Sequence, residues 1–406
     1  MVDTIAIVGA SLSGGRAALG LRQDGFDGRV LLIGGEPHEP YERPPLSKEI
    51  LRGIADAESV SLVPPGAYDE AEIELVLGTR AESVRPTDRS VVLADGRSIT
   101  ADKVLLSTGA DPRPFTLTGH HLAGVHALRT LDDAVALRDA LVPGANVVVI
   151  GAGFIGAEVA ATAQARGCSV TMIEMADLPL QRVLGPTFGA LYADMHRSNG
   201  VTLHCNSMPE AIEGSAHCTA VRLTDGTALP ADVVVCGIGV TPAVALAQSA
   251  GAALDNGIVV DGHCRTSIPN LYAAGDVTSR PSSYASGLLR LESWQNAQNH
   301  GIAAAASMLG AGKEFDELPW FWSDQYDVNL QVAGIPSPQD TIVWRGDPQA
   351  HDGAAFYIRG NLVTGVVGLN RARDVRASMD IIKKQIPVNP AELADESTNL
   401  RTLGKR

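Results

Sequence analysis

The chain has 406 residues, of which 45% are hydrophobic and 19% are charged, and its formal net charge is −14. This composition is typical of a globular protein with two or three domains. The acidic balance excludes binding to nucleic acid through the phosphate backbone, because that binding needs clustered lysine and arginine. No apolar run approaches the roughly 20 residues needed to cross a bilayer. The N-terminus shows no export signal, so we expect a cytoplasmic protein that is not integral to a membrane.

Residues 5–8 and 29–33 are nearly continuous apolar runs, typical of parallel strands that are buried on both faces. Between them, residues 14–23 favour a helix, and the turn before this helix reads Gly9-Ala-Ser11-Leu-Ser-Gly14. In such a turn the glycines let the backbone approach a pyrophosphate, and the helix N-terminus offers N–H groups and the positive end of its dipole. The segment therefore predicts a dinucleotide site, with Glu36 after the second strand as its ribose ligand.

Ser11 stands where the middle glycine of this fingerprint is usual. Serine is small and keeps its backbone N–H, so it weakens the match without removing it. A serine among glycines also raises the alternative of a hydrolase. The nucleophile elbow needs Gly-x-Ser-x-Gly, however, and position 13 is occupied by Ser13, so hydrolysis is disfavoured.

The same pattern returns in the middle of the chain. Strand-like runs at residues 147–150 and 170–174 flank a helix-favouring segment at 154–165, and the turn between reads Gly151-Ala-Gly153-Phe-Ile-Gly156. Glu174 ends the second run, where a carboxylate accepts both ribose hydroxyls and repels a 2′-phosphate. This segment predicts a second dinucleotide, and it favours NADH over NADPH.

Each of these units carries a hairpin-like segment, at residues 90–99 and 220–229, with an Asp-Gly turn. From about residue 316 the glycine turns stop, and tryptophans, strand-like alternation and a helix at 375–384 predict an α+β domain. The polar tail at 394–406 has little to pack.

The cysteines are odd in number and scattered, with no Cys-x-x-Cys pair and no histidine at metal-ligand spacing. We therefore predict structural thiols and no metal site. The five positions are Cys168, Cys205, Cys218, Cys236 and Cys264.

Several motifs in a fixed order carry a resemblance to a known family. Besides the two glycine turns they are Arg43-Pro-Pro-Leu-Ser-Lys48, Leu106-Ser-Thr-Gly109, Gly237-Ile-Gly-Val-Thr-Pro242, Thr266-Ser-Ile-Pro-Asn-Leu-Tyr-Ala-Ala-Gly275-Asp276 and Glu292-Ser-Trp294-Gln-Asn-Ala-Gln298. The chain resembles FAD-dependent pyridine nucleotide reductases. It is similar in particular to the ferredoxin reductases of bacterial oxygenase systems, such as the putidaredoxin, rhodocoxin and biphenyl-dioxygenase ferredoxin reductases.

The resemblance implies an α/β fold of the glutathione-reductase type, with two Rossmann-like dinucleotide-binding domains and a C-terminal α+β domain. FAD would bind the first domain, made of residues 1–110 and 235–315, and NADH would bind the second, residues 111–234. The isoalloxazine would lie between them, and residues 316–406 would form the C-terminal domain.

The resemblance also implies roles for single residues. Lys48 would lie near flavin N5 and pair with Glu158, where a cation stabilises the reduced ring. Trp294 would lie at the flavin edge and completes the predicted catalytic set with this pair. Arg43 would approach the FAD phosphates, and Asp276 would hold the ribityl and pyrophosphate region. The other predicted cofactor-binding positions are Gly9, Ser11, Gly14, Glu36, Thr108, Gly109, Gly151, Gly153, Gly156, Glu174, Gly239 and Gly275.

No cysteine occurs before Cys168, so the redox cysteine that other members of this superfamily place near the flavin is missing. Electrons must leave the flavin directly, and we expect a 2Fe-2S ferredoxin as the acceptor. This ferredoxin would serve a haem-thiolate monooxygenase or an aromatic-ring dioxygenase, and the sequence does not choose between them. A basic docking surface for an acidic ferredoxin is expected near Arg290, Arg371, Arg373 and Arg376.

Two alternatives stay open. The acceptor could be rubredoxin or another small carrier in place of a ferredoxin. The chain could also be a redox sensor resembling apoptosis-inducing factor, in which NADH binding changes conformation or assembly; the net charge of −14 argues against the DNA-binding mode of such a protein.

Overall fold

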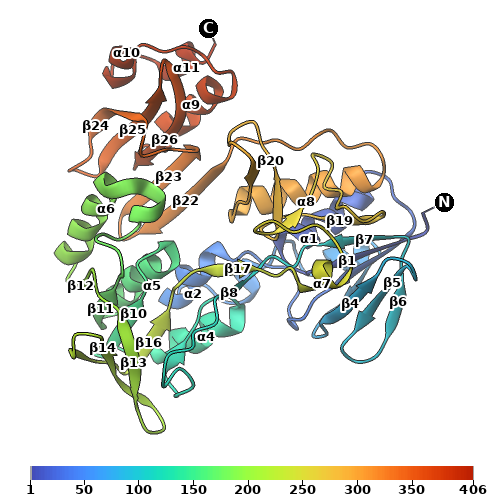
Figure 1. Ribbon diagram of the computed structural model, residues 1–406, viewed down its shortest axis with the longest axis horizontal. Coiled ribbons are helices and arrows are strands. Elements are labelled where there is room, and N and C mark those ends of the chain that lie inside the picture. Colours follow the sequence, from blue (N-terminus) through green and yellow to red (C-terminus); the bar gives the residue numbers. More distant parts are fainter. Residues whose placement is uncertain (1, 406) are drawn as a thin grey trace. The chain divides into compact units, whose positions relative to one another are not determined.

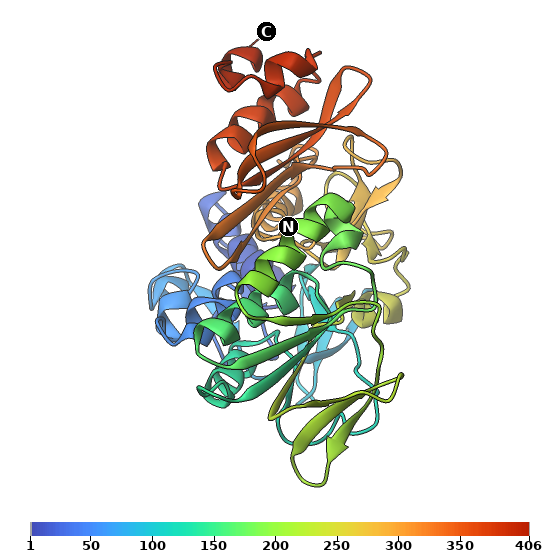
Figure 2. The ribbon, with the colours of Figure 1, turned by 90° about the vertical axis from the view of Figure 1, so that its left-hand side faces the viewer.

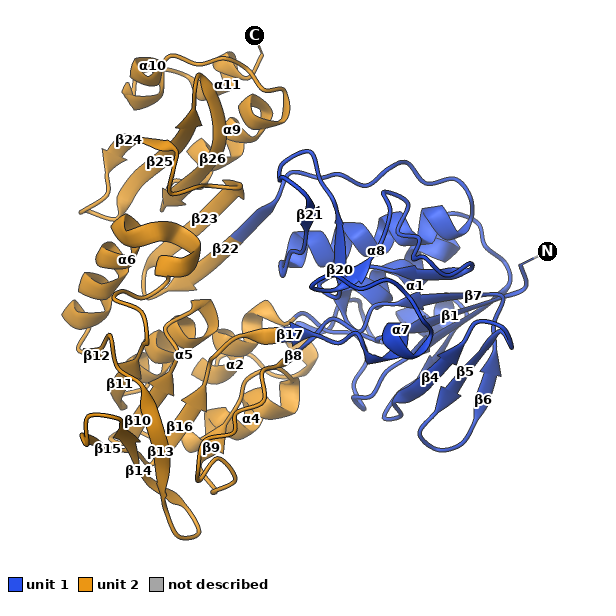
Figure 3. Cartoon of the chain, viewed as in Figure 1, with its two compact units in different colours: residues 1–42, 60–111, 241–321 blue, residues 43–59, 112–240, 322–406 orange. Residues whose placement is uncertain are grey.

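The chain forms two units in the computed structural model, which describes residues 2–405 (Figure 3). Unit 1 comprises residues 1–42, 60–111 and 241–321, and unit 2 comprises residues 43–59, 112–240 and 322–406. The short segment 43–59 thus packs in unit 2, although the segments on both sides of it belong to unit 1. The predicted four-part division of the chain stays a prediction.

Unit 1 is built on a five-stranded parallel sheet (Figure 1). Its strands, in spatial order, are β19 (Leu271–Ala273), β7 (Lys103–Leu106), β1 (Thr4–Val8), β2 (Arg29–Ile33) and β3 (Ile73–Val76). Ile5 and Ile7 on β1 pack in a core with α1 (Leu12–Gln23) and α8 (Trp294–Met308). Ala6 and Val8 pack in a second core with β4 (Ala81–Arg85) and β5 (Ser90–Leu93). Both faces are covered, which explains why the strands are apolar throughout.

Smaller elements complete unit 1. The predicted hairpin is present, because β5 pairs antiparallel with β6 (Ser98–Thr100). The remaining elements are the helices η2 (Glu58–Val60), α3 (Ala67–Glu70) and α7 (Ala245–Ser249) and the strands β18 (Ile258–Val259), β20 (Thr278–Pro281) and β21 (Leu288–Leu289); η2 begins at the end of segment 43–59. The strands β8 (Ala110–Pro112) and β17 (Val240–Pro242), where the chain changes units, form a two-stranded sheet.

Unit 2 repeats this design. Its parallel sheet has the order β12 (Thr202–His204), β11 (Ser169–Ile173), β10 (Asn146–Ile150), β16 (Val233–Cys236) and β9 (Val125–His126). Val147 and Val149 face a core with α4 (Leu131–Ala140) and α5 (Phe154–Ala165). Val148 and Ile150 face the antiparallel strands β13 (Pro209–Gly214), β14 (Cys218–Leu223) and β15 (Ala228–Pro230). The segment 43–59 adds η1 (Pro44–Ser47) and α2 (Glu49–Arg52).

The C-terminal part of unit 2 is a five-stranded sheet covered on both faces (Figures 1 and 2). Its order is β22 (Trp320–Gln325), β23 (Val328–Gly334), β26 (Leu362–Leu369), β25 (Asp352–Arg359) and β24 (Thr341–Asp347). On one face, Val375 of α9 (Ala372–Lys383) lies over Gly368. On the other face lies α6 (Gln181–Ser198), where the Phe188 and Trp344 rings are 5.3 Å apart. This part is the α+β domain that the tryptophan-containing region predicted.

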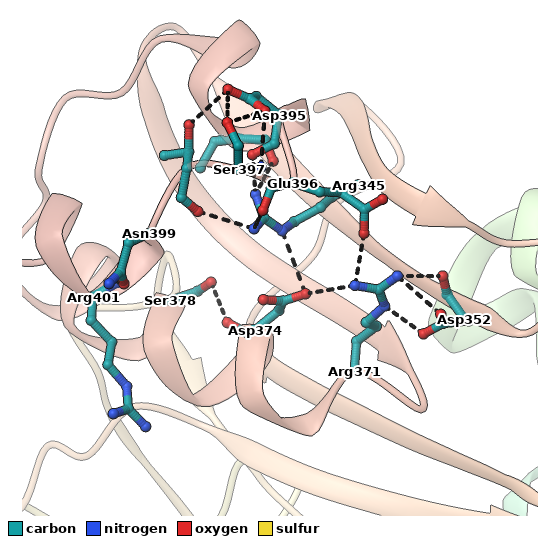
Figure 4. Close-up of polar contacts among 12 residues, drawn as sticks. Arg345, Asp352, Arg371, Asp374, Ser378, Asp395, Glu396, Ser397, Asn399 and Arg401 are labelled. Atoms are coloured by element: carbon teal, nitrogen blue, oxygen red, sulfur yellow. Dashed lines mark hydrogen bonds and ion pairs between the residues drawn. The ribbon is translucent and has the colours of Figure 1, made fainter.

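The expectation that the tail has little to pack is wrong. Leu393 on α10 (Pro390–Ala394) is buried, and so are Leu400 and Leu403 on α11 (Leu400–Leu403). Arg345 on β24 also holds this segment, since its guanidinium donates to backbone carbonyls (Figure 4). These acceptors are the carbonyl oxygens of Leu393 (3.2 Å), Asp395 (2.6 Å), Glu396 (3.0 Å) and Thr398 (3.0 Å). These leucines lie on two short helices that a polar stretch separates, so no continuous amphipathic pattern in the sequence indicates this packing.

We predict that Arg345→Met releases the tail, because four carbonyls lose a charged donor. The free energy of unfolding should fall by about 3 kcal/mol, and protease should cleave after residue 390 sooner than in the unchanged chain. Urea denaturation and limited proteolysis with mass spectrometry measure both. Arg401→Met is the control, because Arg401 is exposed and points away from this cluster (Figure 4). Equal proteolysis of both variants would contradict the assignment.

Candidate functional site

The outer glycines of both turns are required by the protein's own backbone. A Cβ atom on Gly9 would lie 2.2 Å from the Ser107 carbonyl oxygen, and one on Gly14 would lie 2.0 Å from the Gly9 oxygen. The second turn repeats this, since a Cβ on Gly156 would lie 2.0 Å from the Gly151 oxygen. In each unit the strand and the helix that follows it can therefore approach each other only if these positions lack a side chain.

The middle position of each turn is different. A Cβ added to Gly153 would meet nothing within 4 Å, so the protein itself does not need glycine there. The space fits a ligand that approaches the backbone at the N-terminus of α5, as the pyrophosphate of a dinucleotide does. The matching position in unit 1 is Ser11, the half-exposed N-cap of α1, whose side chain makes no capping hydrogen bond. Both turns thus suit a dinucleotide, and the first tolerates a serine.

The two predicted ribose carboxylates lie beyond the carboxyl ends of their strands. In unit 2, Glu174 follows β11, and its oxygens accept hydrogen bonds from the N–H groups of Ala152 (2.8 Å) and Ala176 (2.9 Å). The first of these donors lies inside the glycine turn, so Glu174 is held beside it. In unit 1, Glu36 follows β2 and accepts a 2.5 Å hydrogen bond from the Tyr41 hydroxyl. Their contacts with ribose stay predictions.

Within unit 1, the motif around Gly275 meets the first glycine turn. A Cβ on Gly275 would lie 3.1 Å from the side chain of Ser13, and the Gly275 N–H donates to His300 Nδ1 at 3.2 Å. Asp276 follows, and Arg290 donates to its backbone carbonyl at 3.5 Å. The motif and the turn therefore form one region of unit 1.

Three further predicted positions of unit 1 lie in defined backbone settings. Thr108 Oγ1 donates to the Ala243 carbonyl at 2.8 Å, and Gly109 has a φ of 67°. Trp294 is the first residue of α8, directly after its N-cap Ser293.

Sequence reasoning missed His300 and Ser13. His300 is fully buried and stacks on Phe315 with ring centroids 4.6 Å apart, and burial lowers its pKa to about 3. The Ser13 hydroxyl is buried and has no hydrogen-bond partner within residues 2–405. A single histidine or serine on a helix gives no pattern that separates it from ordinary core, so the sequence held no signal for either.

Lys48 and Glu158 form a buried ion pair inside unit 2. The Lys48 ammonium lies 2.7 Å from Glu158 Oε2, and the two side chains are only 9% and 5% exposed. The Ser47 hydroxyl donates to the same oxygen at 2.5 Å, and Ser323 donates to Oε1 at 2.7 Å. The Pro44 carbonyl accepts from the ammonium at 3.1 Å. These extra hydrogen bonds satisfy both charges, which a buried pair requires.

Two other predicted residues lie in unit 2. Arg43 precedes η1, and its guanidinium donates to the Arg129 carbonyl. Gly239 has a φ of 95°, and its carbonyl accepts a 2.9 Å hydrogen bond from Arg113 N–H. Their roles toward the cofactors stay predictions.

The arginines expected to dock a partner differ in exposure and in whether they are already paired with a carboxylate. Arg371 lies 2.5 Å from an Asp352 oxygen and 2.9 Å from a Glu396 oxygen (Figure 4). Arg290 is largely buried and lies 2.5 Å from Glu292. Arg373 and Arg376 are exposed on α9.

All five cysteines are free thiols. Burial raises the pKa of Cys236 and of Cys264 to about 12, so these thiols stay protonated and poorly nucleophilic. Among residues 2–405 no group of histidine, cysteine, aspartate and glutamate is arranged to hold a metal ion. In the same part of the chain, every helix is too short or too polar to cross a membrane.

Two dinucleotide-binding folds, each with a fitting glycine turn, and a buried lysine–glutamate pair define a nucleotide-dependent oxidoreductase. The pyridine nucleotide-disulphide oxidoreductase family matches residues 3–301, and the reductase C-terminal family matches residues 320–404. The chain belongs to the pyridine nucleotide-disulphide oxidoreductase family. This confirms the predicted fold class and the predicted cofactors, FAD and NADH.

Relatives match over the full length. Putidaredoxin reductase of Pseudomonas putida is 38% identical, with 99% of this chain and 96% of the relative covered. The ferredoxin–NAD(+) reductase component of the anthranilate 1,2-dioxygenase system of Burkholderia cepacia is 42% identical, with 98% and 99% covered. The reductase in a covalent putidaredoxin reductase–putidaredoxin complex superimposes with a TM-score of 0.95 at 38% identity, covering 99% of this chain and 98% of that chain. The predicted resemblance is confirmed.

The middle and last glycines of the second turn should respond differently to the same change. Gly156→Ala should lower the melting temperature, because its Cβ would collide with the Gly151 oxygen. Gly153→Ala should fold normally and bind NADH about tenfold more weakly, because its methyl group enters the open space of the turn. Thermal unfolding and fluorescence titration with NADH separate the two effects. Unchanged NADH affinity in Gly153→Ala would contradict the assignment.

Proposed function

We propose that this protein oxidises NADH and supplies single electrons to a 2Fe-2S ferredoxin that serves an oxygenase. The observation that carries the proposal is full-length similarity, at 38% and 42% identity, to reductases that pair with such systems. The two glycine turns support it, because one enzyme then binds both a flavin dinucleotide and a nicotinamide dinucleotide. When bound, FAD accepts the hydride equivalent from NADH and releases its two electrons one at a time.

The chain's own residues bind and orient the two dinucleotides in this proposal. The first turn and the N-terminus of α1 would hold the FAD pyrophosphate, with Glu36 on its ribose. The second turn and α5 would hold NADH, and the negative charge of Glu174 would exclude a 2′-phosphate. Asp276, Thr108, Gly109, Gly239, Gly275 and Arg43 would complete the FAD site.

Lys48 would stabilise negative charge on the reduced cofactor, and Glu158 would keep its ammonium oriented. The geometry of unit 2 supports this role, since the pair is buried, 2.7 Å apart and surrounded by further donors. A fixed cation in a site that excludes water interacts with developing charge far more strongly than one in solvent. Trp294, at the start of α8, would contact the flavin edge.

A one-electron acceptor also agrees with the state of the cysteines. The five thiols are free, and burial raises the pKa of Cys168, Cys205, Cys218, Cys236 and Cys264 alike. No cysteine precedes Cys168 in the sequence, so the segment around Lys48 offers no redox-active thiol and electrons would pass to the partner without a dithiol. Buried reduced thiols also support a location in the cytoplasm.

The ferredoxin would dock through the exposed arginines of α9. Residues 320–406 contain ten acidic and ten basic residues, whereas the whole chain has a net charge of −14. This domain therefore repels an acidic partner less than the rest of the protein does. Of the four predicted arginines, Arg373 and Arg376 are the best candidates, because Arg371 and Arg290 are already paired with carboxylates. Whether the terminal oxygenase is a monooxygenase or a dioxygenase stays open.

Anaerobic stopped-flow mixing tests the electron path. NADH should bleach the flavin rapidly, NADPH should do so much more slowly, and the reduced protein should then reduce a putidaredoxin-type 2Fe-2S ferredoxin. Glu174→Gln should lower the preference for NADH about tenfold, because it removes the charge that repels the 2′-phosphate. Exposed Glu82→Gln is the matched control. Faster transfer to rubredoxin than to any ferredoxin would favour the other acceptor, and slow flavin reduction with a long-lived nucleotide complex would favour a redox sensor.

Charge reversal tests the docking surface. The double change Arg373→Glu and Arg376→Glu should raise KM for ferredoxin about tenfold at low ionic strength, because both charges oppose an acidic partner. Ferricyanide is small and should be reduced at the unchanged rate. Arg401→Glu, an exposed arginine on α11, is the control. Equal losses with ferredoxin and ferricyanide would place the defect inside the protein and contradict docking at α9.

A further inference from the structure

A continuous row of hydrogen bonds leads away from Glu158 toward the C-terminal sheet. Ser323 on β22 donates to Glu158 Oε1 at 2.7 Å, and Gln325 Nε2 donates to the Ser323 hydroxyl at 3.3 Å. His196 Nε2 lies 3.0 Å from Gln325 Oε1, and His196 Nδ1 lies 2.9 Å from the Tyr326 hydroxyl. Ser323, Gln325 and His196 are at most 1% exposed, and Tyr326 is half-buried. All of these residues belong to unit 2.

The carboxylate determines the direction of every bond in this row. An ionised Glu158 can only accept, so the Ser323 hydroxyl must donate to it and can then accept from Gln325 Nε2. Gln325 Oε1 is an acceptor, so His196 carries its proton on Nε2, and Nδ1 accepts from the Tyr326 hydroxyl. Burial lowers the pKa of His196 to about 4, in agreement with a neutral ring that has one N–H. Four aligned bonds polarise one another toward the negative charge.

This arrangement holds charge in place and does not carry protons. A proton passing through the row would have to be relayed by the amide of Gln325, which is neither an acid nor a base near neutral pH. It would also have to charge His196, which burial disfavours. The polarised row instead aims the Ser323 hydroxyl at Glu158 Oε1, while Oε2 accepts from Lys48 and Ser47.

We infer that Ser323 is a positioning residue, which fixes the Glu158 carboxylate and through it the Lys48 ammonium, with Gln325, His196 and Tyr326 orienting its hydroxyl. The C-terminal domain then contributes Ser323 to the site, in addition to the α9 arginines of the proposed docking surface. Without this hydroxyl, Oε1 loses its donor from β22, and the carboxylate is free to rotate away from the ammonium. The inference rests on the proposed function, in which Lys48 stabilises charge on the reduced cofactor.

The test compares Ser323→Ala with Ser378→Ala. Ser378 is equally buried in the same domain, but its hydroxyl donates to the Asp374 carbonyl within α9. In Ser323→Ala the limiting rate of flavin reduction by NADH should fall about tenfold, while half-saturating NADH stays within twofold, because positioning and not binding is lost. Ser323→Cys keeps the side-chain geometry and a weak donor, although sulfur is larger than oxygen, so its rate should be intermediate. Ser378→Ala should reduce at the unchanged rate.

A second measurement does not depend on activity. Acetic anhydride labelling of the protein as purified, without NADH, followed by peptide mass spectrometry, reports how tightly the Lys48 ammonium is held. Labelling of Lys48 should rise several-fold in Ser323→Ala and stay unchanged in Ser378→Ala. Unchanged rate and unchanged labelling in Ser323→Ala would overturn the inference.

Two failures would still leave the inference testable: misfolding of Ser323→Ala, and lack of reduction of the unaltered protein by NADH. If Ser323→Ala does not fold, Tyr326→Phe replaces it, since it removes only the half-buried end of the row. Tyr326→Phe should then give smaller changes in the same direction. If the rate and the labelling both stay unchanged in this variant, the inference is overturned. If the unaltered protein is not reduced by NADH, the proposed function fails, whereas Lys48 labelling still decides whether Ser323 holds the pair.

Discussion

The buried ion pair of Lys48 and Glu158 is the interaction on which unit 2 depends most. Moving two charges out of water costs several kcal/mol per ion, and only close contact with further hydrogen bonds offsets that cost. The donors come from segment 43–59 and from β22, and the accepting carboxylate comes from α5, so three distant parts of the sequence meet here. The pair therefore requires segment 43–59, the dinucleotide fold and the C-terminal sheet to be in register, and a shift of any one leaves a buried charge without its partner.

The two glycine turns show a second constraint, which is the close backbone contact at the outer glycines of each turn. The first and last glycines are needed because a side chain there would collide with the protein's own backbone. This requirement is independent of any ligand. The protein's own packing does not require glycine at position 153, and the first turn has Ser11 at the matching position; that the ligand sets this position stays a prediction. A fingerprint that is read as a single motif thus combines a folding requirement with a binding requirement.

The parts of the fold that local patterns determine could be predicted from the sequence. Both βαβ units and the hairpin turns at Gly96 and Gly226 were predicted, because strand period and turn chemistry act over a few residues. Packing of the tail onto Arg345 was not, since a guanidinium that binds backbone carbonyls has no sequence signature. Ser323 was missed for a related reason, since its partner Glu158 lies 165 residues away along the chain.

The strand order also sets the order in which the molecule can be completed during synthesis. The sheet of unit 2 has all of its strands once residue 236 is made. The sheet of unit 1 begins with β1 at residue 4, yet its edge strand β19 is Leu271–Ala273. Domains of a growing chain usually fold from the N-terminus onward. Here the sheet that starts first must wait with an unpaired edge at β7 until the ribosome has passed the second sheet, so the nascent chain has a particular need for protection at that edge.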